Sequence, residues 1–293
     1  MIEALTIAGR RFEWGRRTYL MGILNLTPDS FSGDGLGVDL DAALDQAQRF
    51  AEAGADILDL GGESTRTNAV PVSETEEEQR VLPVLEVIHA ALPLPLSIDT
   101  FKPEVARAAL QAGGHLLNDI TGLAHPVMRT LAAESGAPVI IMHSRGNAQT
   151  MQQLTDYNGD VLGELERFFE QRLTEVEAAG VKCEKIILDP GIGFAKTATQ
   201  NLEILRNLPR LRRLGYPLLI GVSRKAFIGR LVAGPGQESR PPSERVYGTV
   251  AAVTLAIAGG ADIVRVHDVE ALAGAIRVAD AIVRSASPEF DWV

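Results

Sequence analysis

Short runs of apolar residues alternate along this chain with longer segments in which apolar positions recur at helical spacing. The short runs predict buried β-strands at 19–24, 57–60, 95–98, 115–117, 139–142, 186–188, 218–221 and 263–266. The longer segments predict helices at 40–53, 74–91, 103–112, 126–135, 160–179, 201–214, 244–258 and 269–284. Strands and helices that alternate over this length predict a single-domain (β/α)8 TIM barrel spanning residues 1–293.

The segments next to this repeating pattern refine the prediction. Apolar residues at 5–7 and 12–14 flank A-G-R-R, which predicts a short N-terminal β-hairpin at about residues 4–15. The alternative fold is an open doubly wound sheet, but no G-x-G-x-x-G follows the first strand of the repeat. The barrel is therefore the favoured architecture.

Composition and charge narrow the classes of partner. A hydrophobic content of 46% supplies a core, while the formal net charge of −10 disfavours nucleic acid or an anionic membrane as the main partner. No apolar stretch approaches the roughly 20 residues that span a bilayer. The first residues, M-I-E-A-L-T, do not resemble a signal peptide, and Cys183 is the single cysteine. We therefore expect a cytoplasmic protein without an internal disulfide.

Polar residues stand where nearly every predicted strand ends. They are Asn25, Glu63 to Arg66, Asp99, Asn118, Asp119, His143, Asp189, Ser223 to Lys225, Arg265 and His267. In a (β/α)8 barrel the strand ends meet at one face, which carries the active site. We therefore predict that these side chains form one site rather than a set of unrelated turn residues.

The predicted site has an acidic part and a basic part. Asp99, Asn118 and Asp189 directly follow strand interiors, so they are expected to accept hydrogen bonds from a flat ring rich in N–H donors. The basic residues lie slightly further along the loops and are Arg66, Lys225, Arg265 and His267. Loops after the last two strands of such barrels frequently bind phosphate, which suits basic side chains. This arrangement predicts a substrate with a polar heterocycle and an anionic leaving group.

Two long loops without periodicity, 27–38 and 61–72, are rich in glycine and small polar residues. Such loops in a compact domain are usually functional, and we expect both to close over bound ligand. A metal-dependent hydrolase on this barrel would need converging histidines, but the chain has no His-x-His pair. His143 is expected to have either a supporting or a structural role.

Several motifs occur in a fixed order over about residues 19–282. They are M-G-I-L-N-L-T-P-D-S-F-S, G-G-E-S-T-R, S-I-D-T-F-K, L-N-D-I-T-G, I-L-D-P-G-I-G-F, G-V-S-R-K-A-F-I-G and R-V-H-D-V. In this order they resemble the dihydropteroate synthases. The resemblance implies a pterin-binding barrel enzyme of folate biosynthesis. Such an enzyme condenses 6-hydroxymethyl-7,8-dihydropterin diphosphate with p-aminobenzoate, giving 7,8-dihydropteroate and pyrophosphate, and is inhibited by sulfonamides.

The resemblance also implies roles for individual residues. The residues expected to hold the pterin are Asp99, Asn118, Ile120, Met142, Asp189 and Lys225. Those expected to border p-aminobenzoate are Thr65, Arg66, Phe194, Ser223 and Lys225. Those expected at the diphosphate are Asn25, Arg66, Arg265 and His267, with Asn25 also binding Mg²⁺. Catalysis is expected to depend on Asp99, Lys225, Arg66, Arg265 and His267, and the family usually forms a homodimer.

The chain departs from the family pattern in two loops. The first reads S-F-S-G-D-G where the family usually has S-F-S-D-G-G, so Asp34 stands one position late. In the second, Thr67 replaces the proline that usually follows S-T-R, which bears on sulfonamide sensitivity. Two alternative functions stay open. One is a pterin-binding methyltransferase, which has no need of the diphosphate-binding residues, and the other is a non-catalytic paralogue that binds pterin.

Overall fold

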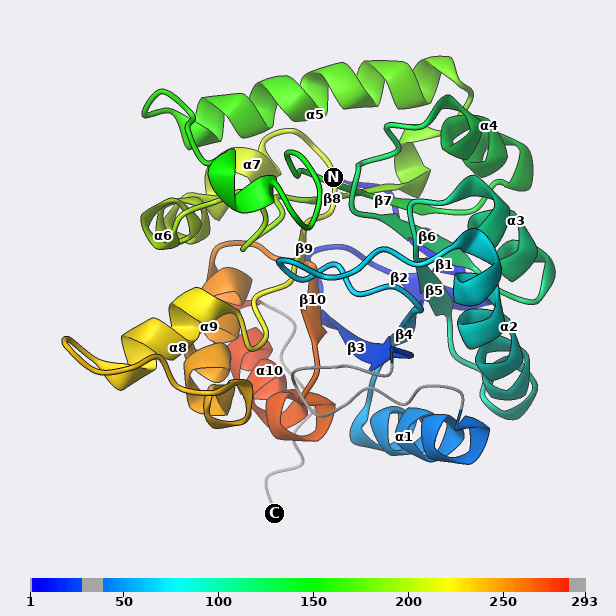
Figure 1. Ribbon diagram of the computed structural model, residues 1–293, viewed down its shortest axis with the longest axis horizontal. Coiled ribbons are helices and arrows are strands. Elements are labelled where there is room, and N and C mark those ends of the chain that lie inside the picture. Colours follow the sequence, from blue (N-terminus) through cyan, green and yellow to red (C-terminus); the bar gives the residue numbers. More distant parts are fainter. Residues whose placement is uncertain (1, 28–38, 285–293) are drawn as a thin grey trace.

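The computed structural model describes residues 2–27 and 39–284, which form a (β/α)8 barrel (Figure 1). Its parallel strands are β3 (Tyr19–Asn25), β4 (Ile57–Gly61), β5 (Leu96–Asp99), β6 (Leu116–Asp119), β7 (Val139–Met142), β8 (Ile186–Asp189), β9 (Leu219–Ile220) and β10 (Ile263–Val266). They lie side by side in the order β8-β7-β6-β5-β4-β3-β10-β9. A parallel bridge between Leu188 and Leu218 joins the two outer strands, so the sheet closes on itself. The predicted fold class is confirmed.

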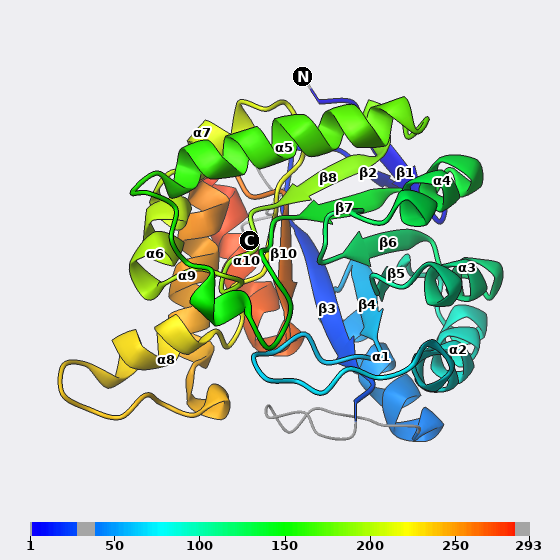
Figure 2. The same cartoon turned by 45° about the horizontal axis from the view of Figure 1, so that its top comes forward.

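The helices surround the strands (Figures 1 and 2). They are α1 (Leu40–Ala53), α2 (Glu74–Ala91), α3 (Pro103–Gln111), α4 (Pro126–Ser135), α5 (Val161–Ala178), α6 (Ala198–Arg206), α7 (Leu208–Arg212), α8 (Ala226–Ala233), α9 (Val246–Ala258) and α10 (Val269–Val283). Short polar side chains begin several of them, as where Ser73 accepts a hydrogen bond from the backbone N–H of Glu76. None of these described helices is long and apolar enough to cross a membrane.

Two helical regions differ from the prediction. The helix expected at 201–214 is divided into α6 and α7 at Asn207, because Pro209 lacks the N–H that a continuous helix would use. Helix α8 was not predicted, because its eight residues, A-F-I-G-R-L-V-A, form a short and mostly apolar run. Its position matters for the site because it begins directly after Lys225.

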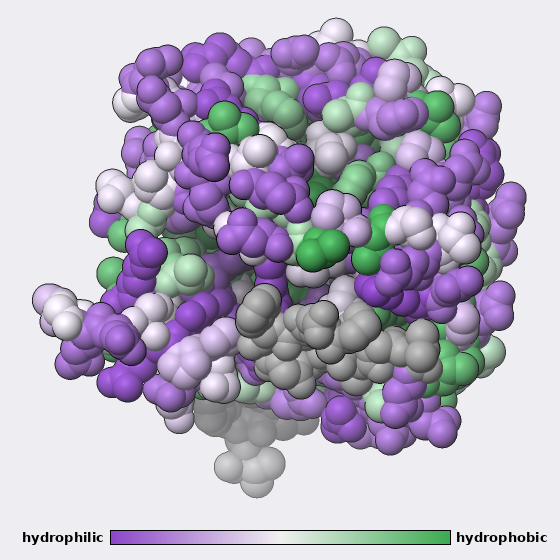
Figure 3. Space-filling model, viewed as in Figure 1, coloured by the Kyte–Doolittle hydropathy of each residue, from purple (hydrophilic) through white to green (hydrophobic). Residues whose placement is uncertain are grey.

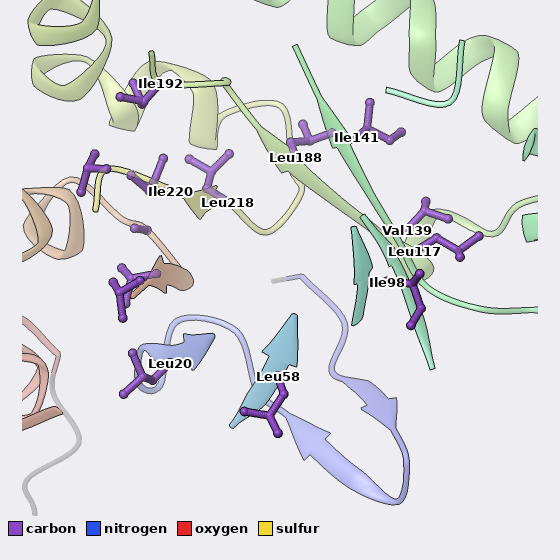
Figure 4. Packing of buried hydrophobic residues seen from close by; sticks show 14 of the residues in the cluster. Leu20, Leu58, Ile98, Leu117, Val139, Ile141, Leu188, Ile192, Leu218 and Ile220 are labelled. Atoms are coloured by element: carbon purple, nitrogen blue, oxygen red, sulfur yellow. The ribbon is translucent and has the colours of Figure 1, made fainter. Parts of the chain in front are cut away.

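The outer faces of the strands pack against the helices. Figure 4 shows such side chains on successive strands, among them Leu20, Leu58, Leu117 and Leu188. These residues are at most 3% exposed. The apolar runs in the sequence therefore correspond to strands that are buried on both faces, as expected when helices cover a parallel sheet.

A hairpin closes the N-terminal end of the barrel. It consists of β1 (Leu5–Ile7) and β2 (Arg10–Phe12), and it packs with Trp14 against the first residues of the barrel strands. The second strand lies two residues earlier than predicted. Ala8 and Gly9 both have positive φ, which gives a two-residue turn and pairs Ile7 with Arg10.

Candidate active site

The C-terminal ends of the strands surround a cavity of about 610 Å³, a size typical of small-molecule sites. The residues expected to bind substrate all line it: Asn25, Thr65, Arg66, Asp99, Asn118, Ile120, Met142, Asp189, Phe194, Ser223, Lys225, Arg265 and His267. Each barrel strand, or the loop after it, contributes at least one of them. Asp119 and His143, which were also predicted to belong to the site, do not line the cavity. Figure 3 shows hydrophilic residues gathered on the face that carries the β4–α2 loop, drawn in cyan in Figure 1.

Asp99, Asn118 and Asp189 form the floor of the cavity. They are the polar ends of β5, β6 and β8, and the strand register places Asp99 beside Asn118. Asn118 and Asp189 are 4% and 6% exposed. Burial raises the pKa of Asp189 to about 6, opposed by the backbone N–H of Gly191, which donates to its Oδ1 at 2.7 Å. Burial also raises the pKa of Asp99 above its ordinary value, partly offset by the charge of Arg265.

Arg265, which lines the cavity, is held between two carboxylates. Its Nε donates to Asp59 Oδ2 at 2.5 Å, and a terminal N–H donates to Asp99 Oδ2 at 2.6 Å. Asn118 Nδ2 also donates to Asp59, at 3.2 Å. Burial acts to lower the pKa of Arg265, but the charges of Asp59 and Asp99 raise it above its ordinary value. Asp59 therefore orients both Arg265 and Asn118.

Asp59 was missed by the sequence analysis. It lies within β4 and is 0% exposed, whereas the prediction considered only residues at strand ends. The available signal was a single acid in the otherwise apolar run I-L-D-L. A fully buried carboxylate requires a partner, and here the partner is Arg265.

One oxygen of the Asp99 carboxylate has no hydrogen-bond partner among the described residues. It is Oδ1, which is buried, whereas Oδ2 accepts from Arg265. A buried acceptor without a partner costs free energy, so it marks the place where a ligand donor would bind.

The basic side of the cavity contains Lys225 next to Phe194. The Lys225 Nζ lies 4.1 Å from the centroid of the Phe194 ring. Burial lowers the pKa of Lys225 to about 8, and the charge of Arg265 acts in the same direction. Because no carboxylate of residues 2–27 or 39–284 forms an ion pair with Lys225, its charge is available to a ligand.

Ser223 and His267 contact each other across β9 and β10. The backbone N–H of His267 and its ring Nδ1 both lie 3.1 Å from Ser223 Oγ. Ser223, which was predicted to border p-aminobenzoate, therefore lines the cavity while it supports His267. Its neighbour Arg224 pairs instead with Asp268, at 2.5 Å, and so joins the two loops.

The loop between β4 and α2 is anchored at its base by Lys102. The Lys102 ammonium donates to Glu63 at 2.5 Å, to Glu77 at 2.6 Å and to the carbonyl of Val72 at 2.7 Å. Both carboxylates are nearly buried, at 10% and 1% side-chain exposure. Thr65 and Arg66 lie between the two ends of this anchored segment.

The tip of the same loop contacts the loop between β7 and α5. Gln149 donates to the carbonyl of Ala69 at 2.6 Å, and Gln152 donates to Thr67 Oγ1 at 3.2 Å. Thr67, at the position where a proline was expected, therefore makes a hydrogen bond that proline has no hydroxyl to form. The predicted closing loop lies against its neighbour at the mouth of the cavity.

The other long loop is only partly described. Thr27 lines the cavity, but Asp34, and with it any metal or lid role, lies outside the described residues. In the described part of the chain, no group of three His, Cys, Asp or Glu side chains is arranged to hold a metal ion.

Comparison with known proteins gives consistent results. The family described as "Pterin binding enzyme" matches residues 21–267. A dihydropteroate synthase of Synechocystis sp. is 53% identical over 281 residues, which cover 96% of this chain and 95% of the relative. A dihydropteroate synthase of Escherichia coli is 44% identical over 263 residues, covering 90% and 91%.

Solved structures of such enzymes superimpose closely. The Yersinia pestis dihydropteroate synthase with a sulfonamide drug complex has a TM-score of 0.90 at 41% identity, covering 96% of this chain and 99% of that one. The Xanthomonas albilineans dihydropteroate synthase with 4-aminobenzoic acid has a TM-score of 0.87 at 43% identity, covering 97% and 99%.

Proposed function

The chain belongs to the dihydropteroate synthase family of pterin-binding enzymes, and from this premise we propose how its cavity performs the family's reaction. The enzyme is a transferase that condenses 6-hydroxymethyl-7,8-dihydropterin diphosphate with p-aminobenzoate to give 7,8-dihydropteroate and pyrophosphate. The observation that carries the residue assignment is the buried, unpartnered Oδ1 of Asp99 beside Asn118 and Asp189.

The pterin ring occupies the acidic floor. Asp99, Asn118 and Asp189 accept hydrogen bonds from the N–H groups of the ring, and the burial that raises the pKa of both acids strengthens such bonds once a donor is present. Ile120 and Met142 supply the apolar contacts that a flat ring needs. Lys225, above the floor, donates to the ring's own acceptors.

Departure of diphosphate leaves positive charge on the pterin methylene and ring. The carboxylate of Asp99 stabilises this cation electrostatically, and Asp59 holds Arg265 in place for the leaving group. Arg66, Arg265 and His267 bind the diphosphate oxygens. The aniline nitrogen of p-aminobenzoate then attacks the methylene carbon and forms the C–N bond. The proton that this nitrogen loses passes to the departing pyrophosphate or to water, without a strong general base, since the pKa of the protonated amine is low.

The diphosphate is proposed to enter with Mg²⁺, bound through Asn25. Mg²⁺ prefers oxygen ligands, and the amide of Asn25 offers one at the cavity; the ion usually completes its shell with phosphate oxygens and water. When bound, Mg²⁺ would offset the charge that grows on the leaving diphosphate. Asn25 stands at the end of β3, on the same rim as Arg265 and His267.

p-Aminobenzoate is proposed to bind beside Phe194, Lys225, Ser223 and Thr65. The N-terminus of α8 supports this location. Lys225 occupies the N-cap position, and no side chain caps the helix there. The first N–H groups of the helix, at Ala226 and Phe227, are therefore suited to bind a carboxylate. Both residues line the cavity. Sulfonamides, which mimic this substrate, are proposed to bind here too.

We also propose that the protein is a cytoplasmic homodimer. Helices α9 and α10 carry exposed apolar side chains, with Leu255 at 69%, Val278 at 61% and Ile282 at 79% exposure, and together they border a shallow apolar cavity. A continuous apolar face of this kind is typical of a protein interface. Cys183 is a free, exposed thiol, as a reducing compartment would keep it.

A product assay tests the proposed function. The purified protein is mixed with Mg²⁺, the pterin diphosphate and p-aminobenzoate, and both pyrophosphate and dihydropteroate are measured. Equal amounts of the two products are expected. Pterin binding without either product at saturating substrate would refute the synthase assignment and favour the non-catalytic paralogue. The pterin-binding methyltransferase would likewise form no dihydropteroate.

A further inference from the structure

A buried lysine lies beneath the loop that carries Phe194. Lys196 is 3% exposed, and its ammonium makes no ion pair within the described residues. It donates instead to the carbonyls of Gly191 and Phe194, each at 3.0 Å, and to His143 Nδ1 at 2.9 Å. The N–H donors of an ammonium are thus matched by three neutral acceptors.

His143 is suited to accept this hydrogen bond. It is 1% exposed at the end of β7, and burial, together with the charge of Lys196, lowers its pKa to about 2. The ring is therefore neutral, and its Nδ1 accepts from Lys196 in the tautomer that carries the proton on Nε2. The backbone N–H of His143 donates to the carbonyl of Asp189 at 2.9 Å, so its position is tied to β8.

The loop after β8 bends closely around the ammonium. Gly191 has a φ of +67°, and a Cβ there would lie 2.0 Å from the carbonyl oxygen of His143. Burial lowers the pKa of Lys196 to about 7, against the attraction of Asp189. The buried ammonium is stabilised by the two carbonyls, by His143 Nδ1 and by the charge of Asp189, and through the two carbonyls it fixes the shape of the bend.

We propose that Lys196 is a positioning residue for the p-aminobenzoate subsite. Its ammonium fixes the carbonyl of Phe194, and through it the ring that contacts Lys225 at 4.1 Å. Asp189 belongs to β8, and the β-ladder to β7 holds its backbone in place, so that Lys196 acts on it only through charge. Lys196 therefore affects the binding of p-aminobenzoate more than that of the pterin. This inference rests on the proposed function, since the subsite is defined by that reaction.

The first test replaces Lys196 by Met, which keeps the length of the side chain and removes its donors. With wild-type turnover established, Lys196→Met is expected to raise the KM for p-aminobenzoate about tenfold, equivalent to about 1.4 kcal/mol. The KM for the pterin diphosphate is expected to stay within about twofold. Lys182→Met, on the exposed segment before β8, is the matched control and should change neither constant.

The second test acts on the acceptor instead of the donor. His143→Leu removes the lone pair that Lys196 uses, whereas the amide oxygen of Asn in His143→Asn stands close to the position of Nδ1. We expect the Leu variant to reproduce the selective rise in KM and the Asn variant to remain near wild type. The double variant Lys196→Met/His143→Leu should show less than the sum of the two effects, because both remove one contact.

The possible outcomes separate the two proposals. A wild-type protein without turnover refutes the proposed function. With turnover present, a folded Lys196→Met protein whose KM for p-aminobenzoate is unchanged, or whose two KM values rise equally, overturns the positioning role. If Lys196→Met does not fold, the comparison of His143→Leu with His143→Asn decides, and equal KM values in that pair overturn the inference.

Discussion

Asp189→Asn is predicted to make the protein more stable while it weakens pterin binding. Asp189 is 6% exposed, and burial raises its pKa to about 6. In the unfolded chain the same group has a pKa of about 3.9. A rise of about two pKa units means that the ionised carboxylate costs about 3 kcal/mol on folding. Asn removes this cost and still offers an oxygen to the N–H of Gly191.

The sign of the pH dependence follows from the raised pKa. Between about pH 4 and pH 6 the folded state holds a proton that the unfolded state has lost, so the wild type loses stability as pH rises through this range. Urea unfolding should therefore find Asp189→Asn more stable by about 1–3 kcal/mol at pH 8, with the difference shrinking toward pH 4.

Titration calorimetry measures how the same substitution changes the affinity for the pterin diphosphate. The amide of Asn presents N–H groups toward the donor edge of the pterin, so the pterin diphosphate should bind roughly 100-fold more weakly, from the loss of about 3 kcal/mol of charge-assisted hydrogen bonding. A variant that is less stable than wild type at pH 8, or a stability difference that does not change with pH, would refute the argument that burial of this charge opposes folding.

Four further outcomes are expected. Lys225→Ala should lower kcat/KM by roughly 100-fold or more with little change in melting temperature, because its charge serves the ligand; near-wild-type kinetics would mean that the residue is misassigned. Lys102→Met should destabilise the fold by about 3–5 kcal/mol in urea unfolding, since it leaves Glu63 and Glu77 buried without a counter-charge; an unchanged midpoint of the urea transition would contradict this. Leu255→Glu should convert the proposed dimer to a monomer in sedimentation experiments, whereas an unaltered sedimentation coefficient would place the interface elsewhere. The kcat/KM for the pterin diphosphate should fall as the pH drops through about 7 and about 6, because Asp99 and then Asp189 are protonated, and an Asp189→Asn variant that keeps the whole fall would show that Asp189 takes no part in it.

Much of the barrel could be predicted from the sequence because its strands are buried on both faces. Such strands form short apolar runs, and the polar residue that ends each run marks the rim. Asp99 and Asn118 were found in this way, and the register of β5 and β6 places them side by side. The same logic missed Asp59, because a charged residue inside a strand contradicts the pattern on which the prediction depends.

Contacts between distant loops could not be predicted. The hydrogen bond from Gln152 to Thr67 joins residues 85 positions apart, and nothing local in either loop specifies it. Lys196 was overlooked for a related reason, since a lysine in a glycine-rich loop is ordinarily exposed. The burial of Lys196 becomes favourable only in the folded protein, where the loop after β8 turns its carbonyls toward the ammonium.

The aromatic residues at the hairpin give the protein a built-in optical probe of its folding. Trp14 is 9% exposed and packs against Tyr19, with ring centroids 5.6 Å apart, at the end of the barrel opposite the cavity. The chain has two tryptophans, and the other, Trp292, lies outside the described residues. In a Trp292→Phe background, the emission of Trp14 should follow the opening of the barrel and remain unchanged when ligand binds. A variant that loses activity but keeps this emission has lost chemistry rather than structure.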